Sequence, residues 1–256
     1  MQITKSIVPN LFTLVNLFMG FSAIVAISES DYFKAALFIL FAGIFDLLDG
    51  LIARWVKSAS EFGVELDSLS DAVSFGIAPS FLLYKVYFYQ YLETGLLLAA
   101  LPAITGIIRL ARYNVHLTSL AEKSLFTGFP IPAGAFTIIS FVLFIFLDQQ
   151  ISEPLRIAGI ISVTVLTSLA MISKIKFEPI PRPTLTSIKS KPFVFSFFLI
   201  GVIASIVSLG KLIFPFMLVY FFGNTLRHIF LWIKEKREAV DDIDEGEEPE
   251  IGPYDV

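Results

Sequence analysis

Residues 32–56 read YFKAALFILFAGIFDLLDGLIARWV, an apolar run that is long enough to cross a bilayer as one helix. A transmembrane helix needs about 20 predominantly apolar residues, and this run places Asp46 and Asp49 near its end. An ionisable side chain at membrane depth is costly unless it is paired, binds a metal or faces water. The run therefore predicts a membrane helix with a functional site towards one end.

The whole chain has the composition of an integral membrane protein. Of its 256 residues, 55% are hydrophobic and only 16% are charged, and the mean hydropathy is +0.77. These values exclude the soluble globular, fibrous and disordered classes. The chain has no cysteine, which excludes a disulfide framework, a thiolate metal site and a cysteine nucleophile. Any chemistry must rest mainly on carboxylates, hydroxyls and basic side chains.

Further apolar runs on both sides of residues 32–56 predict an all-α, polytopic membrane bundle of about eight transmembrane helices. The expected spans lie near 9–28, 32–56, 71–91, 95–113, 130–148, 154–174, 193–209 and 212–233. The first run has polar residues inside it and lacks a small-residue cleavage site behind a short core, so we expect it to be retained rather than cleaved as a signal peptide.

Basic residues indicate how the spans are oriented. With the amino terminus inside, fifteen of the 19 Lys and Arg fall on the inner side, so we expect a cytoplasmic-membrane protein with both termini and the active site in the cytoplasm. Residues 235–256 hold ten Asp and Glu against two Lys and Arg, which predicts a disordered acidic tail after a membrane domain of residues 1–234. We expect the basic loop 174–191 to lie along anionic headgroups.

Four carboxylates gather around the second and third spans. Asp46 and Asp49 are three residues apart, and Asp67 and Asp71 are four apart, so each pair lies on one face of its own helix. A short turn near residues 57–60 suits an antiparallel hairpin in which the two acidic faces confront each other. Four acids in this arrangement would repel one another, so we expect a hard-cation site for Mg²⁺ or Mn²⁺.

The carboxylates have two other interpretations. Acids at helix ends can simply face water, but Gly50, Ala53 and Gly63 lie among these four, where larger side chains would crowd a ligand. A metal-ion or cation transporter would use the same acids, but it would favour acids spread across helices at the midplane.

Two further groups of polar residues can face the same site. Asn10, Thr13 and Asn16 form a stripe on the first helix that can supply ligand or metal-shell contacts, or only contacts between helices. Arg109 and Arg112, at the cytoplasmic end of the fourth span, suit a phosphate or carboxylate through charge-assisted hydrogen bonds. Ordinary positive-inside anchoring explains either arginine equally well.

The acidic segment resembles a known family signature. Its pattern is Asp46-x-x-Asp49-Gly50-x-x-Ala53-Arg54, eight residues, then Gly63-x-x-x-Asp67-x-x-x-Asp71, and it matches every fixed position of the CDP-alcohol phosphotransferase motif. Members of that family are membrane enzymes, typically with a six-helix core, that move a substituted phosphate from a CDP-linked donor to an alcohol and release CMP. The last two spans of this chain are then an addition to the core.

The resemblance implies roles for these positions. Asp46, Asp49 and Asp67 would bind two divalent ions, and Asp71 would complete the metal site and act as general base on the alcohol. The residues expected at the CDP donor are Gly50, Ala53, Arg54, Gly63, Asn10 and Thr13. Those expected at the acceptor or a phosphate are Arg109, Arg112 and Asn16.

Segments 9–16, 67–80, 109–114 and 126–133 are similar to those of the bacterial and archaeal phosphatidylserine synthases in this family. This similarity implies CDP-diacylglycerol and L-serine as substrates, a setting among membrane lipids, a homodimer and no nucleic-acid partner. The alternatives within the family are an ether-lipid donor, giving archaetidylserine, and inositol phosphate or glycerol phosphate as the acceptor.

Overall fold

The structure is a computed structural model that describes residues 3–56, 60–118, 127–177 and 192–246. These residues contain helices and no strand, which confirms the predicted all-α class. The elements are α1 (Ile3–Ser28), α2 (Tyr32–Trp55), α3 (Glu61–Asp71), η1 (Ala72–Ile77), α4 (Ala78–Val86), η2 (Phe88–Tyr91), α5 (Leu92–Thr118), α6 (Ile131–Phe141), η3 (Val142–Phe146), α7 (Glu153–Ile172), α9 (Pro192–Val207) and α10 (Ile213–Gly246).

Five helical segments are long and apolar enough to cross a membrane: Ile7–Ser28, Tyr32–Trp55, Phe88–Val115, Glu153–Ile172 and Ile213–Lys234. Two shorter apolar helices cover Ile131–Phe146 and Pro192–Val207. The elements α3, η1 and α4 follow one another without a break over residues 61–86. Each of the eight expected spans thus overlaps helical elements, and the chain is a polytopic helical membrane protein.

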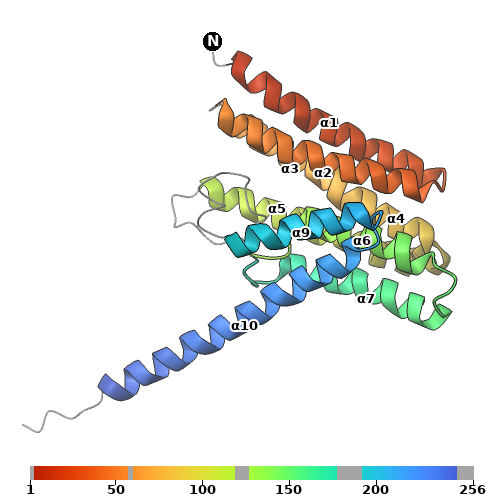
Figure 1. The fold of residues 1–256 in the computed structure, drawn as a ribbon. Coiled ribbons are helices and arrows are strands. Elements are labelled where there is room, and N and C mark those ends of the chain that lie inside the picture. The colour runs from red at the N-terminus through yellow and green to blue at the C-terminus, as the bar shows by residue number, and fades with distance from the viewer. Residues whose placement is uncertain (1–2, 57–59, 119–126, 178–191, 247–256) are drawn as a thin grey trace, which may run out of the picture.

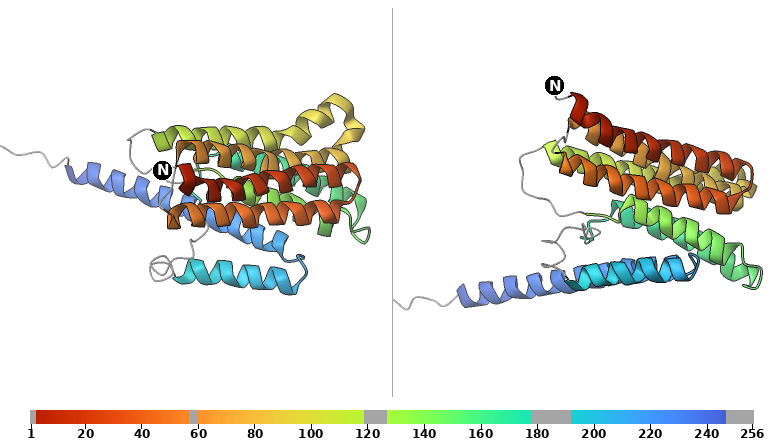
Figure 2. Two further views of the ribbon diagram at one scale, coloured as in Figure 1. Left: turned by 90° about the horizontal axis from the view of Figure 1, so that it is seen from above. Right: turned by 45° about the horizontal axis from the view of Figure 1, so that its top comes forward.

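The helices form a bundle from which α10 projects (Figure 1). The helices α1 and α2 pack as an antiparallel pair, and small side chains such as Ala23, Ala26 and Ala35 are buried and let backbones approach closely. Large side chains such as Phe18 and Phe21 are exposed, as suits a lipid-facing surface. Figure 2 shows α9 and α10 side by side on the opposite side of the bundle from α1 and α2.

The third span differs from its predicted bounds of 71–91. Its helix begins at Glu61, where Ser60 Oγ accepts a hydrogen bond from the Gly63 amide at 3.1 Å as the N-cap. It contains a π-helical turn at Ala72–Ile77 and ends at Val86. Pro79 has no amide hydrogen to donate to the preceding turn, and wider π-type bonding there accommodates the loss. The acidic pair of this span therefore lies within the helix.

The last helix is longer than predicted. We expected disorder from residue 235, but α10 continues to Gly246. Residues 234–239 read KEKREA, and these residue types are good helix formers, so the helix extends past the membrane span despite its charge. Residues 247–256 of the predicted tail and residues 178–191 of the predicted basic loop lie outside the described residues.

Candidate active site

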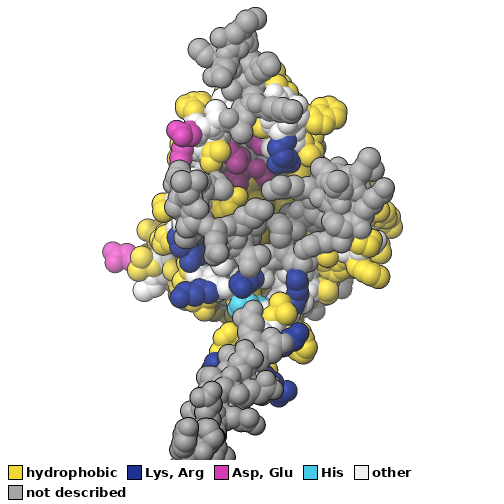
Figure 3. Space-filling view, turned by 90° about the vertical axis from the view of Figure 1, so that its left-hand side faces the viewer, with side chains coloured by type: hydrophobic (Ala, Val, Ile, Leu, Met, Phe, Trp, Pro, Cys, Tyr) yellow, Lys and Arg dark blue, Asp and Glu magenta, His cyan; other side chains and the backbone are white. Residues whose placement is uncertain are grey.

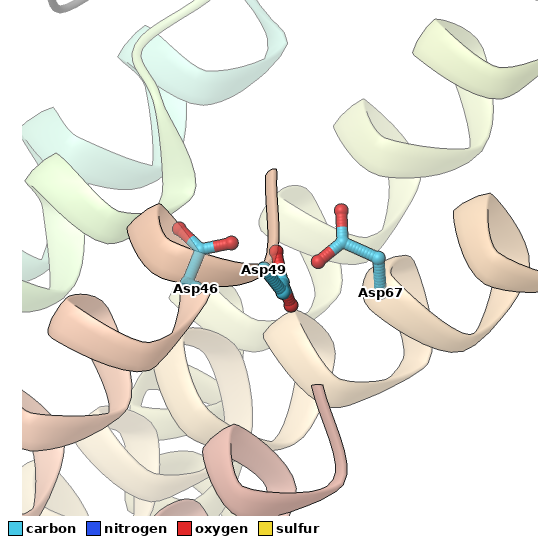
Figure 4. A group of neighbouring side chains, drawn as sticks. All are labelled: Asp46, Asp49 and Asp67. Carbon is cyan, nitrogen blue, oxygen red and sulfur yellow. The ribbon is translucent and has the colours of Figure 1, made fainter. Parts of the chain in front are cut away.

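Three of the four predicted carboxylates meet at one end of the bundle. Asp46 and Asp49 come from α2, and Asp67 comes from α3. Ligand oxygens of these three side chains lie within 4.8 Å of one another. Figure 4 shows the three carboxylates turned towards a common space, with Asp49 between the other two. Figure 3, which looks on to this end, shows acidic side chains set back from the surface, with a Lys or Arg side chain next to them and further Lys and Arg side chains lower on the same face.

This group fits a divalent cation by its chemistry. Carboxylates offer only acceptor oxygens when ionised, and three of them this close repel one another unless a cation or proton lies between them. Oδ1 of Asp67 is buried and has no hydrogen-bond partner among the described residues. A buried oxygen without a donor is the atom that a hard cation would satisfy, and carboxylate oxygens are the ligands that Mg²⁺ and Mn²⁺ prefer.

Asp71 lies next to this group but outside it. Its side chain is only 8% exposed, and its Oδ1 accepts a hydrogen bond from Asn16 Nδ2 at 3.1 Å. Asp71 interacts electrostatically with Asp46 and Asp67. The predicted set of four metal ligands is thus divided into three grouped carboxylates and one neighbour that α1 holds separately.

The predicted polar stripe of α1 does face the carboxylate helices. Asn16 is completely buried, and Thr13 Oγ1 donates a hydrogen bond to Asp49 Oδ2 at 2.7 Å. Asn10 lies against Gly63 of α3, where an added Cβ would lie 3.2 Å from Asn10 Oδ1. Gly63 therefore allows α1 and α3 to approach closely, a structural role beside the predicted donor contact.

The residues predicted to contact the nucleotide lie in the last turns of α2. Gly50 and Ala53 are both partly exposed, and Arg54 is exposed at the end of the helix. An added Cβ at Gly50 would lie 3.4 Å from Arg54 Nη1. Arg54 also interacts electrostatically with Asp49, so it is a cation beside the acidic group. A ligand phosphate there would meet a positive charge.

The two arginines of α5 have different surroundings. Arg112 donates from Nη2 to the Met171 carbonyl at 3.1 Å and from Nη1 to the Ile172 carbonyl at 3.2 Å, so it caps the carboxyl end of α7. Arg109 is 8% exposed, and its Nε donates to the Gly128 carbonyl at 3.4 Å. Arg109 also interacts electrostatically with Asp71. Arg109 is therefore a buried cation that interacts with Asp71 and holds the Gly128 carbonyl. Arg112 holds the end of α7.

Three supporting residues had received no role from the sequence. The Gly128 amide donates to the Ile175 carbonyl at 2.9 Å, and Ser74 Oγ donates to the Asn16 carbonyl at 3.0 Å. Asn114 Nδ2 donates to Ser68 Oγ at 3.0 Å and joins α5 to α3. All three positions lie in segments that were identified by resemblance to the family. Their hydrogen-bond partners are far away in the chain, so no local sequence pattern indicates these contacts.

A separate groove of about 310 Å³ lies between α9 and α10. Four of its nine lining residues are aromatic, among them Phe197, Phe198 and Tyr220, and the carboxylates are not part of it. The acidic group rather than this groove holds the chemically distinctive residues.

Comparison with known proteins agrees with the geometry. A family model described as CDP-alcohol phosphatidyltransferase matches residues 6–175. The chain is 34% identical over 230 residues to a CDP-diacylglycerol–serine O-phosphatidyltransferase of Helicobacter pylori strain J99. The aligned region covers 88% of this chain and 92% of that protein. It is 34% identical to the Bacillus subtilis protein of that name, over 72% of this chain and 96% of the relative. An archaetidylserine synthase of Methanothermobacter thermautotrophicus is 36% identical, over 66% of this chain and 68% of the relative.

Proposed function

The chain belongs to the CDP-alcohol phosphatidyltransferase family, and from this premise we propose that it transfers the phosphatidyl group of CDP-diacylglycerol to L-serine and releases CMP. The observation that carries the proposal is the group of Asp46, Asp49 and Asp67 with Asp71 beside it. Relatives named for serine transfer support the choice of acceptor. The acyl chains of the donor explain why the enzyme is embedded in a bilayer.

The three grouped carboxylates would hold divalent cations, either Mg²⁺ or Mn²⁺, and we expect two ions. Such ions neutralise a diphosphate and stabilise the attacking and leaving oxygens when they are bound. Arg54 faces the donor phosphates, and Gly50 and Ala53 leave space for the cytidine. Asn10 and Gly63 form the adjoining wall where α1 meets α3.

Asp71 is the general base for the serine hydroxyl. Its carboxylate takes the hydroxyl proton as the serine oxygen bonds to the phosphatidyl phosphorus, and the bond from that phosphorus to the CMP oxygen breaks. Asn16 keeps the Asp71 carboxylate in place from α1. Arg109, a cation near Asp71, binds the serine carboxylate.

The site faces the cytoplasm in this proposal, where nucleotide and serine are found. The ends of α2, α5 and α10 that carry Arg54, Arg109 with Arg112, and Lys234 then lie on the inner side of the cytoplasmic membrane. We also propose a homodimer, by likeness to the family. Cysteine labelling from either side of the membrane at Trp55→Cys, together with the mass of the purified protein in detergent, tests both statements.

One experiment separates the alternatives for the reaction. Purified protein is incubated with CDP-diacylglycerol, Mn²⁺ or Mg²⁺ and one of serine, inositol phosphate or glycerol phosphate, and CMP release and lipid product are measured. Serine-dependent CMP release with formation of phosphatidylserine is the expected result. Release with another alcohol alone would assign a different acceptor, and an ether-linked donor tests archaetidylserine formation, which the relative named for that product favours. No release with any alcohol would leave the cation-transport alternative, which the clustering of the acids at one end already disfavours.

A further inference from the structure

The hydroxyl of Thr13 is committed to a carboxylate of the site. Thr13 is 3% exposed, and its Oγ1 lies 2.7 Å from Asp49 Oδ2 and 3.2 Å from the Pro9 carbonyl one turn earlier. A hydroxyl has one proton, and an ionised carboxylate is a stronger acceptor than a neutral carbonyl. The shorter contact agrees with this, so the proton is directed at Asp49. Because the Thr13 side chain is buried and its only proton is directed at Asp49, it has no proton left to donate to a nucleotide, which was the contact expected from the sequence.

Asp49 needs such a restraint because of its neighbours. It is 6% exposed and lies within 4.8 Å of both Asp46 and Asp67, so like charges push it away from the common space. A donor on Oδ2 holds the carboxylate in one orientation, and in that orientation the side chain can present its other oxygen to a cation. Hydrogen-bond partners of metal-binding carboxylates commonly act in this way.

We propose that Thr13 is a positioning residue that fixes the metal-binding orientation of Asp49, an assignment that rests on the proposed metal site. It acts from α1 on a ligand carried by α2, so the first helix takes part in metal affinity without touching the ion. The donor-binding role predicted for Thr13 is replaced by this one.

The test measures Mn²⁺ affinity directly, by calorimetry or electron paramagnetic resonance of the full chain in detergent, with no substrate present. Thr13→Val keeps the shape and removes the hydroxyl, whereas Thr13→Ser keeps the hydroxyl. Thr164→Val is the matched control, because Thr164 is also fully buried and its Oγ1 donates only to the Ile160 carbonyl one turn earlier, at 2.7 Å. Melting temperatures establish that the variants are folded, and Thr13→Ala replaces Thr13→Val if the latter does not fold.

We expect Thr13→Val to weaken Mn²⁺ binding by about 10- to 100-fold, with Thr13→Ser near wild type and Thr164→Val unchanged. Wild-type affinity in a folded Thr13→Val protein would overturn the role of Thr13 and leave the metal site standing. Equal weakening by Thr164→Val would likewise overturn it, because the effect would then reflect general packing. A wild-type chain that binds no Mn²⁺ would instead overturn the metal site itself.

Discussion

Asn16 on α1 holds Asp71 at the junction of α3 and η1, through a hydrogen bond of 3.1 Å from Nδ2 to Oδ1. The backbone of Asn16 is held in turn, because its carbonyl accepts from Ser74 Oγ at 3.0 Å. Asp71 is thus oriented by a neighbouring helix, while Asp46, Asp49 and Asp67 face one another. This difference in surroundings supports a division into a base and a set of metal ligands.

The first prediction concerns Asp71→Asn. The amide oxygen can still accept from Asn16, so the local structure should persist while the basic charge is lost. Positioned general-base help is typically worth about 10²- to 10⁴-fold in rate, and we expect transfer to serine to fall by a factor in that range. Donor affinity and transfer rate should be measured on one preparation, with donor affinity unchanged. A near wild-type rate would mean that another group takes the proton, and lost donor binding would make Asp71 chiefly a ligand.

The second prediction concerns the three grouped carboxylates. Changing Asp46, Asp49 or Asp67 to Asn removes one charged ligand with little change in size, so metal affinity and turnover should fall together. Wild-type protein in excess chelator should lose activity and regain it when Mn²⁺ or Mg²⁺ is added. Full activity in chelator is incompatible with the proposed mechanism.

Much of this arrangement could be predicted from the sequence because it depends on local pattern. Apolar runs indicate where helices cross the membrane, and the three- and four-residue spacing of acids indicates one face of a helix. The grouping of Asp46, Asp49 and Asp67 follows from a short connection between two such helices. The bounds of the helices were less predictable where the backbone hydrogen bonding departs from the α-helical pattern, as at the π-helical turn before Pro79.

The partners of individual polar residues could not be predicted in this way. The sequence was compatible with Arg112 at a substrate or as an anchor, and it carried no sign of the hydrogen bonds to the carbonyl groups of Met171 and Ile172, about sixty positions further along the chain. Thr13 was expected at the donor, but it bonds to Asp49. Such contacts depend on the relative rotation of packed helices, and a single sequence with spaced polar residues is compatible with several rotations.

The third prediction concerns the space beside Gly50. Leu at this position should weaken donor binding while the protein stays folded, because a membrane helix tolerates Leu well. The matched control is Gly223→Leu on α10, where an added Cβ would meet no atom within 4 Å. CDP-diacylglycerol affinity should fall in the first variant and not in the second. Equal affinity in two folded variants would refute the assignment of a nucleotide pocket at Gly50.

The fourth prediction concerns Gly128, which has a φ of +84°. An added Cβ would collide with the Met171 carbonyl, the group that accepts from Arg112. A left-handed conformation alone costs a non-glycine residue roughly 1–2 kcal/mol, and the collision adds to this. Gly128→Ala should therefore lower the melting temperature clearly, whereas Gly223→Ala should not. An unchanged melting temperature would show that the loop before α6 relaxes freely.

The last prediction separates the two arginines of α5. Lysine keeps the positive charge but lacks the planar fork, so Arg112→Lys cannot reach both carbonyls at the end of α7 and should cost about 1–3 kcal/mol of stability. Its substrate affinity should change little in the folded fraction. Arg109→Lys should do the reverse. It should raise KM for serine and change the melting temperature little, because Arg109 is a buried cation that interacts electrostatically with Asp71 and does not cap a helix end. Melting temperature and KM for serine, measured on both variants, give a two-by-two comparison. If both variants lose only stability, Arg109 is structural as well, and the serine carboxylate must be bound by another cation.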